Sequence, residues 1–382
     1  MNSTFQAKEA VWRMAGGDAT RGGLLGAVVR LMARSPRGLA AAGAVQASVV
    51  FDTEGWAFVA DLAGAVQAYT EAGDLRWRVQ LTGGISATPA VDTAASRLFV
   101  GTHAGHAYAL DTGTGGIVWH QEIPTESDPR ILSDLLHLRR AGLVVLSSWG
   151  GRFRALDAAS GVERFSWDAG ISPAAAVSAD RDETLYCLRA VSERGTELVE
   201  VSTSGTERVL HRVAEGQRGA RRMLTAAAPV VDPGRGMVYA VVNPDHGGLL
   251  VAWSVRTQAV TWTCALPNAV QATPALDHSG RLFLPDLAGA VQRVSPEGEL
   301  QAGFRLGCEY LLAGGVGDGE GRFYVGDPWG RVHVIEDGAE PRVLFEAGRA
   351  IQGRPSFGPD RSLHVPGTDR RVYVFPAARA AA

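Results

Sequence analysis

Side chains that could bind a ligand or catalyse a reaction lie in predicted tight turns throughout this 382-residue chain. They are carboxylates, imidazoles, indoles and one amide, namely Asp61, His103, Trp149, Asn243, Asp245, His246, Asp286, Asp327 and Trp329. Gathered on one face of a fold, they could bind a basic segment of a partner protein or a polar ligand. Asp and Asn also favour turns for a local reason, because their side chains hydrogen-bond nearby backbone N–H groups. Both interpretations stay open.

A smaller set could instead supply acids and bases to a pocket: His103, Asp245, His246 and Asp327. No Ser/His/Asp or Cys/His motif provides a nucleophile beside them. A metal site is disfavoured, since His103 and His106 lie on a predicted hairpin without a third ligand nearby. We therefore assign no catalytic residue, no metal and no cofactor, and keep an enzyme acting on a small molecule as an alternative.

A repeated heptapeptide indicates which elements position these residues. The sequence DLAGAVQ occupies residues 61–67 and again residues 286–292, an offset of 225 residues. Five units of about 45 residues give that offset, and this is the period of a four-stranded propeller blade. Repeats of this kind cannot fold separately, so they override the expectation of several domains that the chain length alone would give.

A turn glycine followed by an alternating strand marks each unit. This pattern recurs at residues 64–69, 105–110, 151–156, 195–201, 248–253, 289–294, 330–335 and 370–375. Arg370 takes the glycine position in the last unit. The predicted fold class is therefore all-β: one eight-bladed β-propeller of four-stranded antiparallel blades, forming a single domain over residues 1–382.

The last unit has no fourth strand of its own, because its pattern stops at Pro376. An unpaired apolar run with Trp12 in it lies near the N-terminus, at 7–14. We predict that residues 1–14 supply the missing outer strand, that 15–43 form a linker, and that 44–376 form the blades. Closing the ring in this way removes two exposed sheet edges.

The best copy of the unit runs from Leu98-Phe-Val-Gly101 through Gly105 and Ala109-Leu-Asp111 to Trp119. It resembles the repeat of quinoprotein-type (PQQ-like) eight-bladed propellers. The opening Trp12-Arg-Met-Ala-Gly-Gly-Asp18, with Arg21 and Gly22, is similar to the N-terminal closing segment of that family. The family includes quinoprotein dehydrogenases, the propeller lipoprotein of outer-membrane barrel assembly, and sensor domains of kinases.

The resemblance implies a fold more strongly than an activity. The dehydrogenases of the family stack their quinone against two adjacent Cys and hold calcium with a Glu, Asn and Asp set. Here Cys187, Cys264 and Cys308 are far apart, and no such ligand set can be placed. We expect a non-catalytic scaffold that binds a protein or peptide through the face at its channel mouth. A quinone- or metal-binding sensor is a weaker alternative.

The composition of the chain and the pattern of its N-terminal region limit the classes of partner and the cellular location that we expect. The net charge of −3 favours neither nucleic acid nor an anionic membrane. The apolar stretch at 22–33 is too short to span a bilayer and contains Arg30. No signal-peptide pattern opens the chain. We expect a cytoplasmic, monomeric bacterial protein, with Lys8 as its single Lys.

Overall fold

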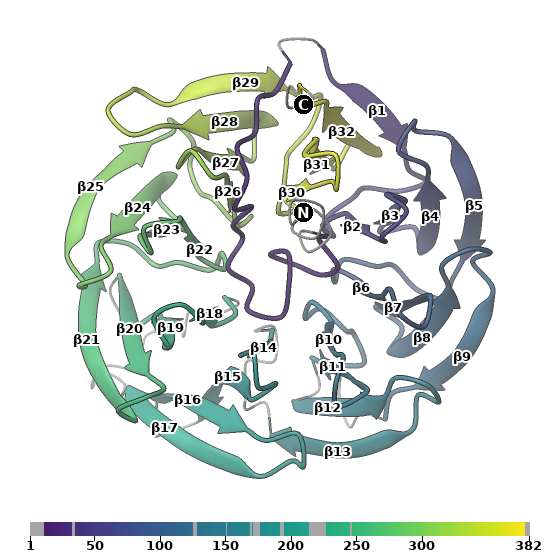
Figure 1. Cartoon of the computed structure of the whole chain (residues 1–382), viewed down its shortest axis with the longest axis horizontal. Helices are drawn as coiled ribbons and strands as arrows, with labels where there is room; N and C mark the ends of the chain where they lie inside the picture. The colour runs from purple at the N-terminus through teal and green to yellow at the C-terminus, as the bar shows by residue number, and fades with distance from the viewer. Residues whose placement is uncertain are drawn as a thin grey trace, which may run out of the picture.

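The computed structural model describes residues 11–32, 35–124, 128–149, 151–168, 170, 176–191, 195–213, 227–244 and 247–378. Its strands form eight four-stranded antiparallel sheets around a central axis (Figure 1). The predicted eight-bladed β-propeller is confirmed. Every regular element in the described part of the chain is a strand, and none of its residues forms a helix long and apolar enough to cross a membrane.

Each of the first four blades runs from an inner to an outer strand in chain order. Blade 1 contains β2 (Val50–Phe51), β3 (Ala57–Ala60), β4 (Ala65–Tyr69) and β5 (Leu75–Gln80). Blade 2 contains β6 (Ala90–Asp92), β7 (Arg97–Gly101), β8 (His106–Asp111) and β9 (Ile117–Glu122). Blade 3 contains β10 (Leu136–Leu138), β11 (Leu143–Ser148), β12 (Arg152–Asp157) and β13 (Glu163–Asp168). Blade 4 contains β14 (Ser178–Ala179), β15 (Leu185–Val191), β16 (Gly195–Val201) and β17 (Glu207–Val213).

The next three blades repeat this order, and the last one departs from it. Blade 5 contains β18 (Val230–Asp232), β19 (Met237–Val242), β20 (Gly248–Ser254) and β21 (Ala259–Leu266). Blade 6 contains β22 (Ala275–Leu276), β23 (Leu282–Pro285), β24 (Ala290–Val294) and β25 (Leu300–Arg305). Blade 7 contains β26 (Val316–Gly317), β27 (Phe323–Gly326), β28 (Arg331–Ile335) and β29 (Arg342–Glu346). Blade 8 contains β30 (Ser356–Phe357), β31 (Leu363–Gly367), β32 (Arg371–Phe375) and, outermost, β1 (Arg37–Ala40).

The closing strand is β1, so the prediction that residues 1–14 close the ring is wrong in position. β1 pairs antiparallel with β32, from Arg37 opposite Val374 to Ala40 opposite Arg371. It lies inside the stretch predicted as a linker because it has a weak sequence signal: of its four residues only Leu39 is buried. The apolar run with Trp12 is buried elsewhere, at the centre of the disc. Its first part, 7–10, lies outside the described residues.

Two local features of the sequence explain how the blades form and pack. The turn before the third strand needs a left-handed residue, and Gly64 has a φ of 82° there. Arg370 adopts the same conformation, with a φ of 68°, at the cost of some strain. Outer-strand Trp residues join neighbouring blades: Nε1 of Trp119 donates to the carbonyl of Ala158 in blade 3 (3.0 Å).

Candidate functional site

The antiparallel order of the strands divides the loops between two faces. Turns from the second to the third strand of each blade, and the links from one blade to the next, lie on one face, which we call the open face. Turns from the first to the second strand and from the third to the fourth lie on the opposite face, which we call the closed face. Every candidate residue predicted from the sequence that the structure describes belongs to the open face.

An N-terminal segment, residues 11–32, crosses the axis on the closed face. We call it the strap; in Figure 1 it is the purple trace over the centre of the disc. The innermost strand of each blade is a sheet edge, and its unpaired amides need acceptors. Strap carbonyls accept hydrogen bonds from innermost strands of six blades, at 2.8–3.0 Å; the donors are Phe51, Val91, Ala179, Val231, Leu276 and Gly317.

The sequence of the strap explains how it can cross the centre of the disc. Trp12 is buried and packs edge-on against Phe357 of β30, with ring centroids 5.6 Å apart. Gly16 (φ 74°) and Gly23 (φ 66°) turn the chain and leave room for the guanidinium of Arg354. A Cβ at Gly16 would lie 2.7 Å from Nη1 of Arg354, and a Cβ at Gly23 would overlap Nη2. The N-terminal motif that begins at Trp12 therefore closes the mouth of the central channel on the closed face.

A cavity of about 240 Å³ lies on the axis above the strap. We call it the axial cavity. Seven of the eight blades line it with residues that precede their innermost strands, and the strap contributes Ala15 and Arg21. Its wall is largely polar and includes Gln46, Ser48, Thr88, Asp134, Gln271, Thr273, Gln352 and Arg354. The side chain of Asp134 is 32% exposed and Leu312 is 42% exposed, so the cavity reaches solvent on the open face.

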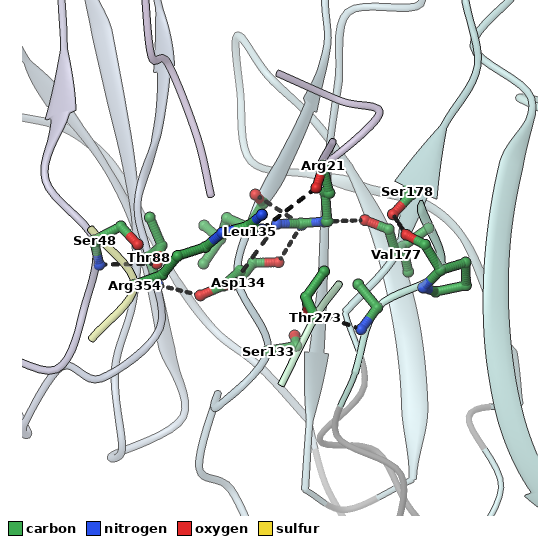
Figure 2. Close-up of polar contacts among 12 residues, drawn as sticks. Arg21, Ser48, Thr88, Ser133, Asp134, Leu135, Val177, Ser178, Thr273 and Arg354 are labelled. Carbon is green, nitrogen blue, oxygen red and sulfur yellow. Dashed lines mark hydrogen bonds and ion pairs between the residues drawn. The ribbon is translucent and has the colours of Figure 1, made fainter. Parts of the chain in front are cut away.

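Two buried arginines lie at the inner end of the axial cavity (Figure 2). Arg21 donates through Nε to the carbonyl of Val177 (2.7 Å) and through Nη2 to that of Asp134 (3.0 Å). Arg354 donates to the carbonyls of Gly315 (2.9 Å) and Arg21 (3.3 Å). These bonds fix the strap to blades 3, 4, 7 and 8, and both side chains line the axial cavity.

Burial acts on the charge of both arginines. It lowers the pKa of Arg21, with Asp134 opposing the effect. It lowers the pKa of Arg354 to about 10, again with Asp134 opposing and with Arg21 adding to the decrease. Both side chains remain cationic at neutral pH, because an arginine guanidinium does not lose its proton in proteins. Asp134 is held in place because its Oδ1 accepts the amide N–H of Thr88 (2.7 Å).

The predicted carboxylates on the open face serve their own turns. Asp61, Asp286 and Asp327 are fully buried. Both oxygens of Asp61 accept backbone amides, including those of Ala42 (2.8 Å) and Ala63 (2.9 Å). Burial alone would raise the pKa of Asp327, but hydrogen bonds from His333 and Arg331 outweigh burial and lower it. Of the two interpretations of the sequence, these carboxylates therefore follow the second: they stabilise turns through hydrogen bonds with the backbone.

The remaining polar candidates lie apart from one another. His103 is half-buried in blade 2, where its Nε2 hydrogen-bonds the hydroxyl of Ser86 (2.7 Å), and burial lowers its pKa. Asn243 joins blades 5 and 6, since it both donates to and accepts from the backbone of Val270 (2.9 Å each). Asp245 and His246 lie outside the described residues. No described contact joins His103 to Asp327 as an acid–base pair.

The two predicted turn tryptophans differ in exposure. Trp149 is partly buried, with the guanidinium of Arg130 5.7 Å from its ring centre. Trp329 is 53% exposed, and Arg331 lies 4.5 Å from its ring centre. Leu312 is the other large apolar side chain of the described open face that is well exposed. Trp329 is therefore the strongest candidate for contact with a partner.

Comparison with known proteins agrees with this architecture. A family model described as "Outer membrane protein assembly factor BamB" matches residues 93–297, which is more than half of the chain. The chain belongs to this family. The resemblance to PQQ-like propellers predicted from the repeat is confirmed. No curated protein matches the sequence.

Solved structures share the fold at low sequence identity. BamB from Moraxella catarrhalis is 16% identical with a TM-score of 0.72, over 90% of this chain and 99% of that chain. Quinohemoprotein alcohol dehydrogenase from Comamonas testosteroni is 13% identical with a TM-score of 0.76, over 98% and 82%. The Dos1 propeller is 13% identical with a TM-score of 0.69, over 91% and 96%. Such likenesses establish the fold alone.

The residues present do not fit the quinone chemistry found among these propellers. Cys187, Cys264 and Cys308 are separate free thiols, and burial raises the pKa of each. Among the described residues, no group of three His, Cys, Asp or Glu side chains is placed to hold a metal ion. The axial cavity instead brings two guanidinium groups and one carboxylate together. We derive no oxidation step for this chain.

Sequence reasoning did not predict the axial cavity, and its charged residues Asp134 and Arg354 were not among the candidates. A signal for them exists in the repeat. Each blade has an equivalent position two residues before its innermost strand, and seven of the eight line the cavity. The eight residues are Ser48, Thr88, Asp134, Ala176, Ala228 (which does not line the cavity), Thr273, Gly314 and Arg354. Six of the eight residues are small or hydroxylated. The two charged ones depart from the pattern at the point where the blades meet.

Proposed function

We propose that this chain is a non-catalytic propeller that binds a partner protein or peptide on its open face. The observation that carries the proposal is the asymmetry of the disc. The strap covers the axis on the closed face, whereas the open face presents the axial cavity and the exposed indole of Trp329. Exposed Trp and Arg side chains in contact, such as Trp329 and Arg331, are typical of binding hot spots.

The comparisons support a binding role. The family is described as an assembly factor, and the similar structures include BamB and the Dos1 propeller. The local contacts support it as well. Asp61, Asp286 and Asp327 are engaged by their own turns, which leaves few free carboxylates on the described open face for acid–base chemistry.

An affinity experiment with matched variants tests the proposal. Tagged wild-type protein, Trp329→Ala and Val343→Ala are used to capture proteins from the native host, and each captured protein is then purified and titrated against all three. Val343 is the control because it is 45% exposed on the outer strand β29, away from the open face. We expect Trp329→Ala to weaken binding at least about tenfold, which corresponds to about 1.4 kcal/mol, and Val343→Ala to bind as wild type.

Two results would contradict the proposal. One is a partner that binds all three proteins equally. The other is the recovery of no partner together with turnover of a small molecule by the purified protein. The cytoplasmic location and monomeric state remain predictions from the sequence, which cell fractionation and light scattering test.

A further inference from the structure

The axial cavity has an excess of positive charge. Its lining contains three ionisable side chains: Arg21 and Arg354, both buried, and Asp134, which is partly exposed. Asp18 also interacts electrostatically with Arg21, but it lines a separate depression on the closed face and does not face this cavity. The cavity wall therefore carries a net charge of about +1, in a place where burial makes uncompensated charge unfavourable.

The arginines also retain hydrogen-bonding capacity. Nη1 of Arg21 is buried without a hydrogen-bond partner among the described residues, and it lies 3.8 Å from Oδ2 of Asp134, beyond hydrogen-bonding distance. A buried N–H without an acceptor is costly, so an acceptor in the cavity would stabilise the site. Two contacts of Arg354, to the carbonyls of Arg21 and Pro274, are long at 3.3 Å.

Hydroxyl groups add neutral donors to the same wall. Thr88 Oγ1 accepts the amide N–H of Ser48, and Thr273 Oγ1 accepts that of Ala228, both at 3.1 Å. Each hydroxyl therefore has its own O–H left to donate. Two guanidinium groups with two hydroxyl donors form a setting that suits a planar oxyanion.

We propose that the axial cavity is a binding site for a monocarboxylate, which enters from the open face and is held by Arg21 and Arg354. A single negative charge would neutralise the cavity, whereas a phosphate dianion would leave it with a net charge of about −1, which burial makes unfavourable. The volume of about 240 Å³ is below the roughly 300–1,000 Å³ of drug-sized ligand pockets. The site therefore suits a small carboxylic acid or the C-terminal residue of a polypeptide.

Calorimetric titration with four probes tests this proposal and distinguishes the two sources. The probes are sodium acetate, sodium phosphate, N-acetyl-trialanine with a free carboxylate, and the same peptide with a C-terminal amide, all at constant ionic strength. We expect acetate or the free peptide to bind with a dissociation constant of about 1 mM or lower, and the amide and phosphate to bind at least about tenfold more weakly. Tighter binding of the peptide than of acetate would identify a chain terminus as the ligand; equal binding would identify a small acid.

Three variants separate a binding role of the arginines from a purely structural one. Arg354→Gln should weaken carboxylate binding at least about tenfold, whereas Arg349→Gln should leave it unchanged, because Arg349 is exposed on the same face and does not line the cavity. Asp134→Asn keeps an oxygen for the amide of Thr88 but raises the net charge of the cavity to about +2. It should therefore strengthen carboxylate binding, by roughly tenfold.

The proposal is independent of whether a protein binds the open face. It is overturned if neither acetate nor the free peptide binds the wild-type protein, or if the folded Arg354→Gln and Arg349→Gln variants bind equally well. If Arg354→Gln does not fold, Asp134→Asn decides: unchanged or weaker carboxylate binding would show that the arginines only fasten the strap to the blades.

Discussion

Replacing Trp12 by Ala tests whether the strap is an integral part of the propeller. The side chain is only 3% exposed, and its ring packs edge-on against Phe357 at 5.6 Å. Its plane also covers Gly17, where an added Cβ would lie 3.2 Å from the ring. Truncating a buried Trp to Ala costs about 3–5 kcal/mol, because transfer energy is lost and a cavity remains.

The size of the chain converts this cost into a modest shift in melting temperature. Unfolding entropy scales with length, and for 382 residues a loss of about 4 kcal/mol lowers the midpoint by about 5 °C. Differential scanning calorimetry resolves a shift of this size. The variant should remain folded, because β1 still closes the ring against β32.

Trp329→Ala is the matched control, since it removes the same side chain from an exposed position. With 53% of Trp329 exposed, its truncation should move the midpoint by less than about 1 °C. The two variants should therefore separate stability from binding: Trp12→Ala melts earlier, and Trp329→Ala loses the partner. Equal melting temperatures for wild type and Trp12→Ala would refute the claim that the strap is packed into the disc.

Three further predictions follow from single contacts. Trp119→Phe keeps an aromatic ring but loses the indole N–H and its hydrogen bond to Ala158, so chemical denaturation should show a loss of about 1 kcal/mol. Trp119→Ala should lose about 3–5 kcal/mol, and equal losses would contradict this division. Burial lowers the pKa of His364 to about 4, so the unfolded state binds more protons between pH 6.5 and 4. Stability should fall by about 3 kcal/mol across that range, and His364→Gln should lack this part of the decline in thermal melts. Leu39→Asp should detach β1 and expose the edge of β32, giving larger species in light scattering, whereas a monodisperse monomer would argue against closure by β1.

The sequence predicted the blades well because each one repeats the same local chemistry. A left-handed turn needs glycine, and the strand after it alternates, so positions such as Gly64 and Gly289 mark the third strand of each blade. The aromatic rings of the outer strands were predictable for the same reason. Trp77 and Trp262 occupy equivalent places and donate to carbonyls of the next blade at 2.8 and 3.0 Å.

The candidate site was harder to predict because turn chemistry and binding chemistry use the same residue types. Asp61 and Asp327 are buried acceptors of their own turns, although the sequence would also allow a ring of carboxylates at the channel mouth. Burial decides between these roles, and burial is set by the link that crosses each turn. The repeat does contain a usable signal, which is a charge at a position where other blades have small residues, as at Asp134 and Arg354.

The strap shows why an apolar run near a terminus is an unreliable guide to sheet closure. The outer strands of this propeller bury few side chains: β9 buries only Trp119 and β1 buries only Leu39, so a closing strand needs little hydrophobicity. The centre of the disc requires more specific residues than the outer edge, because the innermost strands there have unpaired amides and surround a channel that must be filled. Trp12 provides the packing, Gly16 and Gly23 provide the space, and Arg21 provides hydrogen bonds to links from other blades. Once the strap closes one mouth of the channel, its arginine becomes part of the wall of a cavity that opens at the other.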